Sequence, residues 1–240
     1  MTKSKIFVFI MIAGLALSCS KRSDADKIQE AQSCLDSATQ ATWAECMTFV
    51  EGMESAASYN IRCVGKFIEQ GFGSSTKLEQ MMTAISGSSG TSESTGVMSA
   101  LAFDASTDMA LNNSNAEITL RYCSASESPG LIFLSSISQI ATSIAFIQGL
   151  TASQMNDPAQ LLTAIGALQG NPAAQTAVGT AAIAAYNSNC TGQNASQNGD
   201  FCTQFGSAVS AAGGTSNPED VGAIVLLCYA TPTDPRCTGF

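Results

Sequence analysis

One uncharged stretch, residues 129–150, constrains the fold more than any other part of the chain: PGLIFLSSISQIATSIAFIQGL. Its helix breakers are confined to its two ends. At about 100° per residue, the aliphatic side chains fall on one broad arc and the polar ones on the opposite side. The apolar arc holds Phe133, Leu134, Ile137, Ile140, Ala141, Ile144, Ala145 and Ile147, and the polar side holds Ser135, Ser136, Ser138, Gln139, Thr142 and Ser143. The pattern predicts an amphipathic helix around which the other helices close.

A membrane span is the rival interpretation of this stretch, because its length and lack of charge suit a bilayer. However, its polar residues gather on one face, where hydrocarbon would leave them without hydrogen-bond partners. We therefore favour a core helix. Phe146 lies on the polar side, which indicates that this face can also contact another helix.

The first 18 residues have the order of a secretory signal. Lys3 and Lys5 precede the apolar run IFVFIMIAGLAL, and Ala16 and Ser18 are small residues directly before Cys19. Segments of this kind direct export and are removed from the mature protein.

The run LALSC, which ends at Cys19, resembles the lipobox of bacterial lipoproteins. Ala16 stands where that motif commonly has leucine, a departure similar to the looser lipoboxes of spirochaetal lipoproteins. The resemblance implies a signal peptide over 1–18, a diacylglyceryl thioether on Cys19, and a lipidated tether over 19–23 that holds the protein to the membrane. Ser20 replaces the aspartate that would resemble the inner-membrane retention signal of enteric bacteria, which favours the outer membrane.

The cysteine count agrees with acylation, because nine cysteines are an odd number for an exported protein. If Cys19 carries lipid, the remaining eight can form four disulfides in an oxidising envelope. Spacing favours short-range pairs that flank turn-rich or hairpin segments and leaves one long-range pair. These pairs are Cys190–Cys202, Cys228–Cys237, Cys34–Cys46 and Cys63–Cys123.

Helical patterns fill the rest of the chain, and no strand alternation is found. Before residue 127, we expect helices capped by Asp24 or Asp26 and by Thr42, whose TWAE run matches a capping box. Further helical patterns cover 61–73, 97–110 and 114–123, and the polar run 87–96 is expected to be a loop.

Beyond residue 127, four helix starts combine a capping side chain with proline: Ser128-Pro129, Asp157-Pro158, Asn171-Pro172 and Asn217-Pro218. Small residues such as Gly166 and Gly179 would either allow close packing or leave room. The fold class is therefore all-α, a compact multi-helix bundle stapled by disulfides over 24–240. Charges become sparse after 127, so a subdivision into 24–127 and 128–240 stays open.

Catalytic motifs are scarce. The chain has no histidine and no C-x-x-C pair, which removes the commonest general base, most zinc sites and thioredoxin-like chemistry. Ser74 and Lys77 match the S-x-x-K motif of penicillin-binding proteins, but its partner motifs are missing and a helix cap explains the serine. The acid pairs Asp104/Asp108 and Glu51/Glu54 are expected to be solvated helix surface. We expect no catalytic residue, metal or cofactor.

The net charge of −9 argues against a nucleic-acid partner, which needs clustered Lys and Arg. The cysteine-bracketed loops 187–202 and 228–237 are candidate recognition surfaces, although stapling is their simpler role. The sequence favours a non-enzymatic, envelope-anchored lipoprotein that binds a protein partner or serves structurally. The alternative is a carrier of an apolar or lipid-like ligand within the bundle.

Overall fold

Helices make up the regular structure in the part of the chain that the computed structural model describes, residues 22–77, 79–80, 93–191 and 199–237. No strand occurs within those ranges, so the all-α prediction is confirmed. The helices are α2 (Asp24–Leu35), α3 (Trp43–Met47), the 3₁₀ helix η1 (Thr48–Val50), α4 (Ala56–Glu69), α6 (Glu93–Leu101), α7 (Met109–Ala125), α8 (Pro129–Gln148), α9 (Ala152–Met155), α10 (Pro158–Ala167), α11 (Pro172–Asn189), α12 (Gly199–Ala211) and α13 (Pro218–Ala230).

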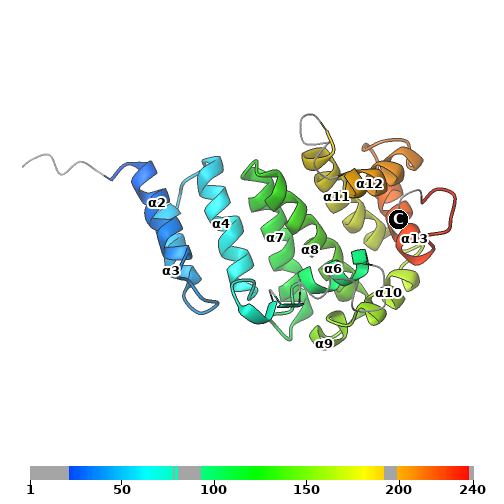
Figure 1. Cartoon of the computed structure of the whole chain (residues 1–240), viewed down its shortest axis with the longest axis horizontal. Helices are drawn as coiled ribbons and strands as arrows, with labels where there is room; N and C mark the ends of the chain where they lie inside the picture. The colour runs from blue at the N-terminus through cyan, green and yellow to red at the C-terminus, as the bar shows by residue number, and fades with distance from the viewer. Residues whose placement is uncertain (1–21, 78, 81–92, 192–198, 238–240) are drawn as a thin grey trace, which may run out of the picture.

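The longer helices follow one another across the molecule in chain order (Figure 1). Each of α2, α4, α7, α8, α11 and α13 packs against the next in that series. α3 and η1 complete a small N-terminal layer with α2, and α12 packs on α11 and α13 at the other end. α8 lies in the middle of the row, where α6, α9 and α10 also contact it.

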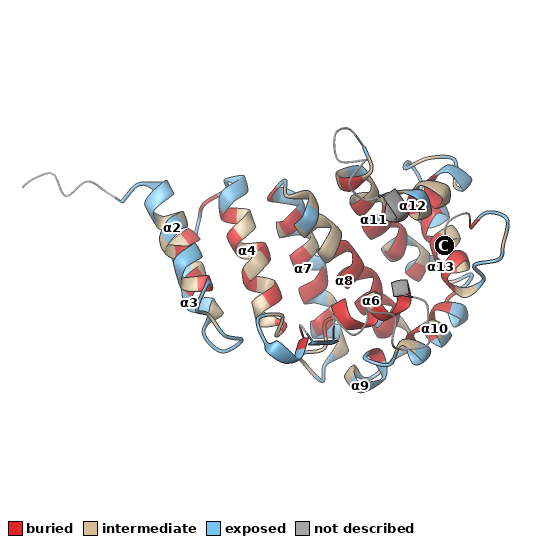
Figure 2. Cartoon of the chain, in the orientation of Figure 1, coloured by how far each residue is buried: buried red, intermediate tan, exposed pale blue. Residues whose placement is uncertain are grey.

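α8 is buried around its whole circumference over 135–145 (Figure 2). It is also, among the described residues, the helix long and apolar enough to cross a membrane, with a mean hydropathy of 1.8 and 61 % of that window buried inside the protein. Its central place confirms that the fold is organised around it. The polar side of the helix is buried as well, and Ser143 on it bonds Asn113 of α7, so this face contacts another helix as the sequence pattern indicated.

The buried hydroxyls of α8 find partners within their own helix. Ser136 and Ser138 donate to the carbonyls of Ile132 and Leu134, four residues earlier, and Thr142 donates in the same way to Ser138. Bonds of this type satisfy a hydroxyl without a second element. A serine-rich face can therefore enter the core at little free-energy cost, which periodicity alone does not reveal.

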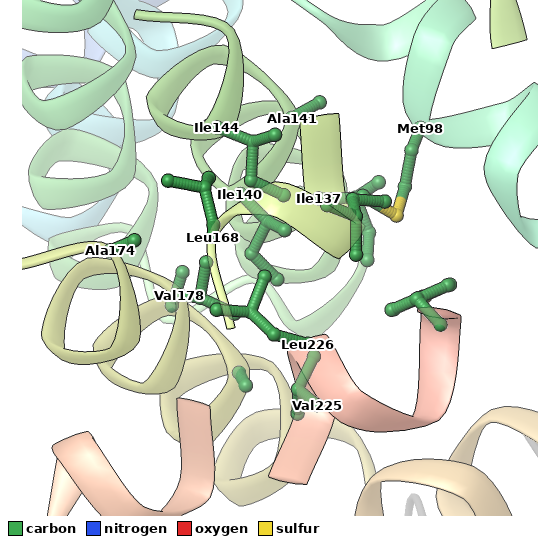
Figure 3. Packing of buried hydrophobic residues seen from close by; sticks show 14 of the residues in the cluster. Met98, Ile137, Ile140, Ala141, Ile144, Leu168, Ala174, Val178, Val225 and Leu226 are labelled. Carbon is green, nitrogen blue, oxygen red and sulfur yellow. The ribbon is translucent and has the colours of Figure 1, made fainter. Parts of the chain in front are cut away.

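The main core lies on the aliphatic side of α8. Ile140 and Ile144 lie close to Leu168 from the loop after α10, and Ile137 lies beside Met98 of α6 (Figure 3). Val178 of α11 and Leu226 of α13 belong to the same cluster. The same cluster contains Met98, Leu101 and Ala102, which precede residue 127. The core thus crosses the proposed boundary at 127/128, while a smaller cluster of α2, α3, η1 and α4 residues lies at the N-terminal end.

At the crossing of α11 and α13 the two helix backbones approach each other closely. A Cβ added to Gly179 would overlap the carbonyl oxygen of Pro218, and one added to Gly222 would overlap the carbonyl oxygen of Gln175. The two backbones are therefore in direct contact, as small residues permit. Of the two roles expected for small residues, Gly179 allows close packing, whereas Gly166 on α10 is exposed with no atom near its added Cβ.

Substitution of Gly179 tests this crossing. Gly179→Ala should lower the free energy of unfolding by about 3 kcal/mol, because the methyl group meets backbone that cannot rotate away. The matched control is Gly166→Ala, which should raise stability by about 0.5–1 kcal/mol through helix propensity alone. Urea denaturation of the oxidised protein measures both values. Equal effects from the two substitutions would show that the backbones do not touch.

Four disulfides join the described cysteines in the pairs that the spacing favours. Cys34–Cys46, Cys190–Cys202 and Cys228–Cys237 close segments of 12, 12 and 9 residues, with Cα–Cα distances of 5.5, 5.2 and 5.1 Å. Cys63–Cys123 has a Cα–Cα distance of 4.9 Å and spans 60 residues. This fourth bond joins α4 to α7 and so ties the N-terminal layer to the middle of the row.

The loss of stability on removing a single disulfide should increase with the length of the loop that it closes. Replacing Cys63 and Cys123 together by alanine should cost about 4 kcal/mol, against about 3 kcal/mol for Cys190 and Cys202, because the longer closed loop restricts the unfolded chain more. Chemical denaturation of the two double variants gives the comparison. A larger loss from the Cys190–Cys202 pair would contradict the chain-entropy explanation.

The predicted helix caps are confirmed in part. The side chains of Asp157, Asn171 and Asn217 accept hydrogen bonds from the first-turn amides of α10, α11 and α13, as predicted. Ser128 makes no such bond, although Pro129 does begin α8. Thr42 does not cap α3 either, because its hydroxyl accepts from the amide of Thr39 instead.

Three other boundaries differ from expectation. Ser23, rather than Asp24 or Asp26, is the cap of α2, and Asp26 completes its capping box. The pattern over 97–110 is interrupted, because α6 ends at Leu101 and α7 begins only at Met109. Residues 93–96, expected in a loop, belong to α6. The rest of that predicted loop lies outside the described residues.

Candidate functional site

A groove of about 1090 Å³ runs between α7 and α11 above α8. Its α7 wall consists of Glu117, Leu120, Arg121, Ser124 and Ala125. The α11 wall is formed by Ala173, Thr176, Ala177, Thr180, Ala181 and Ala184. Both walls consist mainly of small or aliphatic side chains, so the groove is wide and largely apolar. A second hollow between α2 and α4, which includes Ile28 and Asn60, measures only about 440 Å³.

The floor of the groove carries one polar group without a partner. Gln139 of α8 is 5 % exposed, and its amide nitrogen Nε2 donates to Ser143 Oγ at 2.7 Å. Its carbonyl oxygen Oε1 is buried and accepts no hydrogen bond. An unsatisfied buried acceptor costs about 1–3 kcal/mol, and buried polar groups are rarely left in this state. Gln70 Oε1, which lies away from the groove, is buried without a partner in the same way, so this state is not specific to the groove.

A hydrogen-bond chain determines which way the Gln139 amide points. Ser143 Oγ donates to Asn113 Oδ1 at 2.9 Å, and Asn113 Nδ2 donates to Glu117 Oε1 at 2.8 Å. An ionised carboxylate only accepts, so Asn113 must present its amino group to Glu117 and its oxygen to Ser143. Ser143 then uses its hydrogen on Asn113 and accepts from Gln139. The unpaired end of Gln139 is consequently an acceptor rather than a donor.

The rim of the groove carries a cation. Arg121 is exposed and takes part in none of the ion pairs among the described residues. It follows Glu117 by one helical turn on α7, and both side chains line the groove. The groove thus offers an apolar surface, one buried acceptor and one cation at its edge.

An exposed aromatic side chain lies on α8 beyond one end of the groove. Phe146 is 42 % exposed and follows Gln139 by seven residues, which places both on nearly the same line of α8. The sequence pattern had placed Phe146 on the polar side and expected contact with another helix there. The described residues leave a large part of this ring uncovered.

The S-x-x-K match forms a helix cap. Ser74 is exposed, and its hydroxyl accepts from the backbone amide of Lys77 at 3.3 Å. The Lys77 ammonium lies 2.7 Å from Asp104 Oδ1, and the two side chains are only 10 % and 14 % exposed. The Lys77 ammonium is therefore paired with Asp104, while Ser74 acts as the cap of the helix turn.

The acid pairs lie in connections between helices rather than on helix faces. Asp104 lies in the loop between α6 and α7, whereas Asp108 caps α7 by accepting from the amides of Ala110 and Leu111. The prediction that these two share a helix face is wrong. Glu51 and Glu54 lie in the connection after η1 rather than on a helix. No group of three His, Cys, Asp or Glu residues that could hold a metal ion occurs among the described residues.

The two cysteine-bracketed loops differ as recognition surfaces. In the segment closed by Cys228–Cys237, Arg236 donates its side-chain and backbone N–H groups to Asp234. The side-chain bond and then the backbone bond from Arg236 lower the pKa of Asp234 to about 2. The two charges of this loop therefore satisfy each other. Most of the other loop, and Cys19, lie outside the described residues.

No family model, curated protein or solved structure matches this chain. The class of protein is therefore defined by the fold alone: an all-α domain stapled by four disulfides, with a groove over its central helix.

The sequence pattern did not single out the groove residues. Alanines on several sides of α11 are compatible with a core helix and with a groove wall. The observation that came nearest was Phe146 on the polar side of α8. The acceptor of Gln139 becomes visible only when the hydrogen bonds around it are traced.

Proposed function

We propose that this chain is a lipid-anchored lipoprotein of the bacterial envelope, held in the outer membrane, whose helical domain is a non-enzymatic binding module. The groove over α8 is its binding surface, and the ligand is an apolar segment of a partner protein. The observation that carries the proposal is the groove of about 1090 Å³ itself, whose walls on α7 and α11 are lined mainly by small and aliphatic side chains.

Physical arguments favour binding over a purely structural role. Apolar side chains that line a large open groove stay in contact with water, and surfaces of this kind commonly mark binding sites. The exposed Phe146 beside the groove is in keeping with a surface that another molecule covers.

A carrier of an apolar or lipid-like ligand is the second candidate. The size and alanine lining of the groove favour this idea. Against it, small-molecule sites bury about 70–90 % of their ligand, and this groove is open to solvent along its length between two walls. We therefore favour a protein segment over a small apolar molecule as the ligand.

The disulfides support the proposed anchor. They take eight of the nine cysteines, and the ninth is Cys19 in LALSC. Stable anchoring needs more than one acyl chain, which the several chains of a lipoprotein would supply. Since α2 begins at Asp24, the tether over 19–23 would keep the helical domain close to the bilayer.

Fatty-acid labelling tests the anchor. Cells that express the full chain should incorporate an alkynyl fatty acid into the wild-type protein, and the Cys19→Ala variant should incorporate none, because the thioether needs this sulfur. Labelling is read by gel fluorescence after conjugation of a dye. Ser20→Ala is the matched control and should label normally. Equal labelling of wild type and Cys19→Ala would end the proposal of an anchor at this position.

A bulky substitution tests the groove. Thr180 on the groove wall and Thr163 on α10 are both exposed threonines whose hydroxyls bond the carbonyl four residues earlier. Thr180→Trp should fill the groove and weaken binding of the apolar dye anilinonaphthalene sulfonate by at least about tenfold, a loss of about 1.4 kcal/mol. Thr163→Trp should leave dye binding within about twofold. Fluorescence titration gives both affinities, and equal affinities would place the apolar binding surface elsewhere.

A further inference from the structure

We propose that Lys77 and Asn156 condense spontaneously into a side-chain amide, with Asp104 between them as the acid–base group. Lys77 Nζ lies 2.7 Å from Asp104 Oδ1, and Asn156 Nδ2 donates to Asp104 Oδ2 at 2.6 Å. One carboxylate therefore holds both the amine and the amide that the new bond joins. The three residues come from the helical turn after α4, the loop between α6 and α7, and the end of α9. The inference concerns a covalent cross-link and goes beyond the proposed binding function.

The Lys77 nitrogen is short of hydrogen-bond acceptors. It is buried, and apart from its ion pair with Asp104 it makes no hydrogen bond of favourable geometry to the described residues. The ring of Phe72, 5.6 Å away, belongs to an aromatic cluster with Phe67 and Phe103 that excludes water from this side. An ammonium has three donors to satisfy, whereas the nitrogen of a secondary amide has one. The cross-link leaves a single N–H beside Asp104, which can accept it.

The hydrogen bond to Asp104 orients the amide of Asn156. Because an ionised carboxylate only accepts, the atom of Asn156 that faces it is the amino nitrogen, which is the leaving group of the condensation. Asp104 is therefore in position to protonate this nitrogen. Asn156 is exposed at the end of α9, so the released ammonia has a path to water.

The condensation balances without another reactant. Asp104 takes a proton from the Lys77 ammonium, and the free electron pair of Nζ attacks the Cγ carbon of Asn156. Asp104 then protonates Nδ2, Nζ gives up a second proton, and the Cγ–Nδ2 bond breaks as the carbonyl re-forms. The products are the amide of Lys77 with Asn156 and one ammonium ion, so charge is conserved. Groups held together in this way react at effective concentrations on the order of 10⁵ M or more when well oriented.

A second lysine near an acid and an asparagine differs in the decisive contact. Lys66 Nζ lies 2.7 Å from Glu69 Oε2 and donates to Asn115 Oδ1 at 3.2 Å. This ammonium has two acceptors, and Glu69 contacts the lysine rather than the amide nitrogen of Asn115. No acid is therefore placed to protonate the leaving group. Lys66 and Asn115 should stay separate, which makes this pair an internal control.

Mass spectrometry of the full-length protein, purified from the envelope of expressing cells and reduced, tests the cross-link. Peptic digestion of the wild type should yield a branched peptide that joins Lys77 to Asn156 and has lost one ammonia. Lys77→Arg keeps a cation for Asp104 but removes the amine nucleophile, and it should give two linear peptides. Asp104→Ala keeps both reacting groups and should also give linear peptides. Lys66→Arg is the matched control and should keep the branched peptide.

Every result decides the matter. Linear peptides with intact Lys77 and Asn156 from folded wild-type protein would overturn the inference. A branched peptide that has lost water and joins Lys77 to Asp104 would overturn the assignment of Asn156 as the acyl group. A branched peptide that persists in Asp104→Ala would overturn the acid–base role of Asp104. Near-ultraviolet circular dichroism checks that each protein is folded, and Lys77→Arg serves as the comparison if Asp104→Ala is not.

Discussion

The structure depends on the burial of a helix that is only half apolar. α8 is surrounded by other helices, so its serines, threonine and glutamine must find hydrogen bonds inside the protein. The hydroxyls of Ser136, Ser138 and Thr142 do this by bonding carbonyls of their own helix. Helix α8 can therefore accept neighbours on every side, and the row of helices from α2 to α13 is built outward from it.

Gln139 is the exception to this solution, and the groove lies over it. A glutamine side chain is too long and has too many polar atoms to be satisfied by its own helix turn. Its amino group enters the chain that leads to Glu117, and its oxygen is left over. The neighbouring helices α7 and α11 approach α8 from two sides without meeting above this residue. The same polar content that makes α8 unusual as a core helix thus leaves a buried acceptor beneath the groove.

Local signals in the sequence predict the fold well where the structure is decided locally. Pro129 and Gly149 mark the ends of α8 because proline starts a helix and glycine adopts the left-handed conformation that closes it. Asp157, Asn171 and Asn217 mark helix starts because their side chains accept hydrogen bonds from first-turn amides. The pattern over 97–110 misleads because long-range contacts decide it. There Asp104 leaves helical geometry and meets Lys77 and Asn156, which are distant in sequence.

The candidate site could not be predicted in the same way, because it consists of relationships between helices. Alanines along α11 have the same periodicity whether they face a core or a groove, and only the separation of α7 from α11 distinguishes the two. Likewise, nothing in the residue type of Gln139 tells whether its oxygen has a partner; that depends on Glu117, which ends the hydrogen-bond chain on the opposite helix. An acidic residue at the rim therefore determines the polarity of a neutral amide on the floor. The groove is accordingly a property of three helices together, and a substitution on α7 can alter the hydrogen bonds of α8 beneath it.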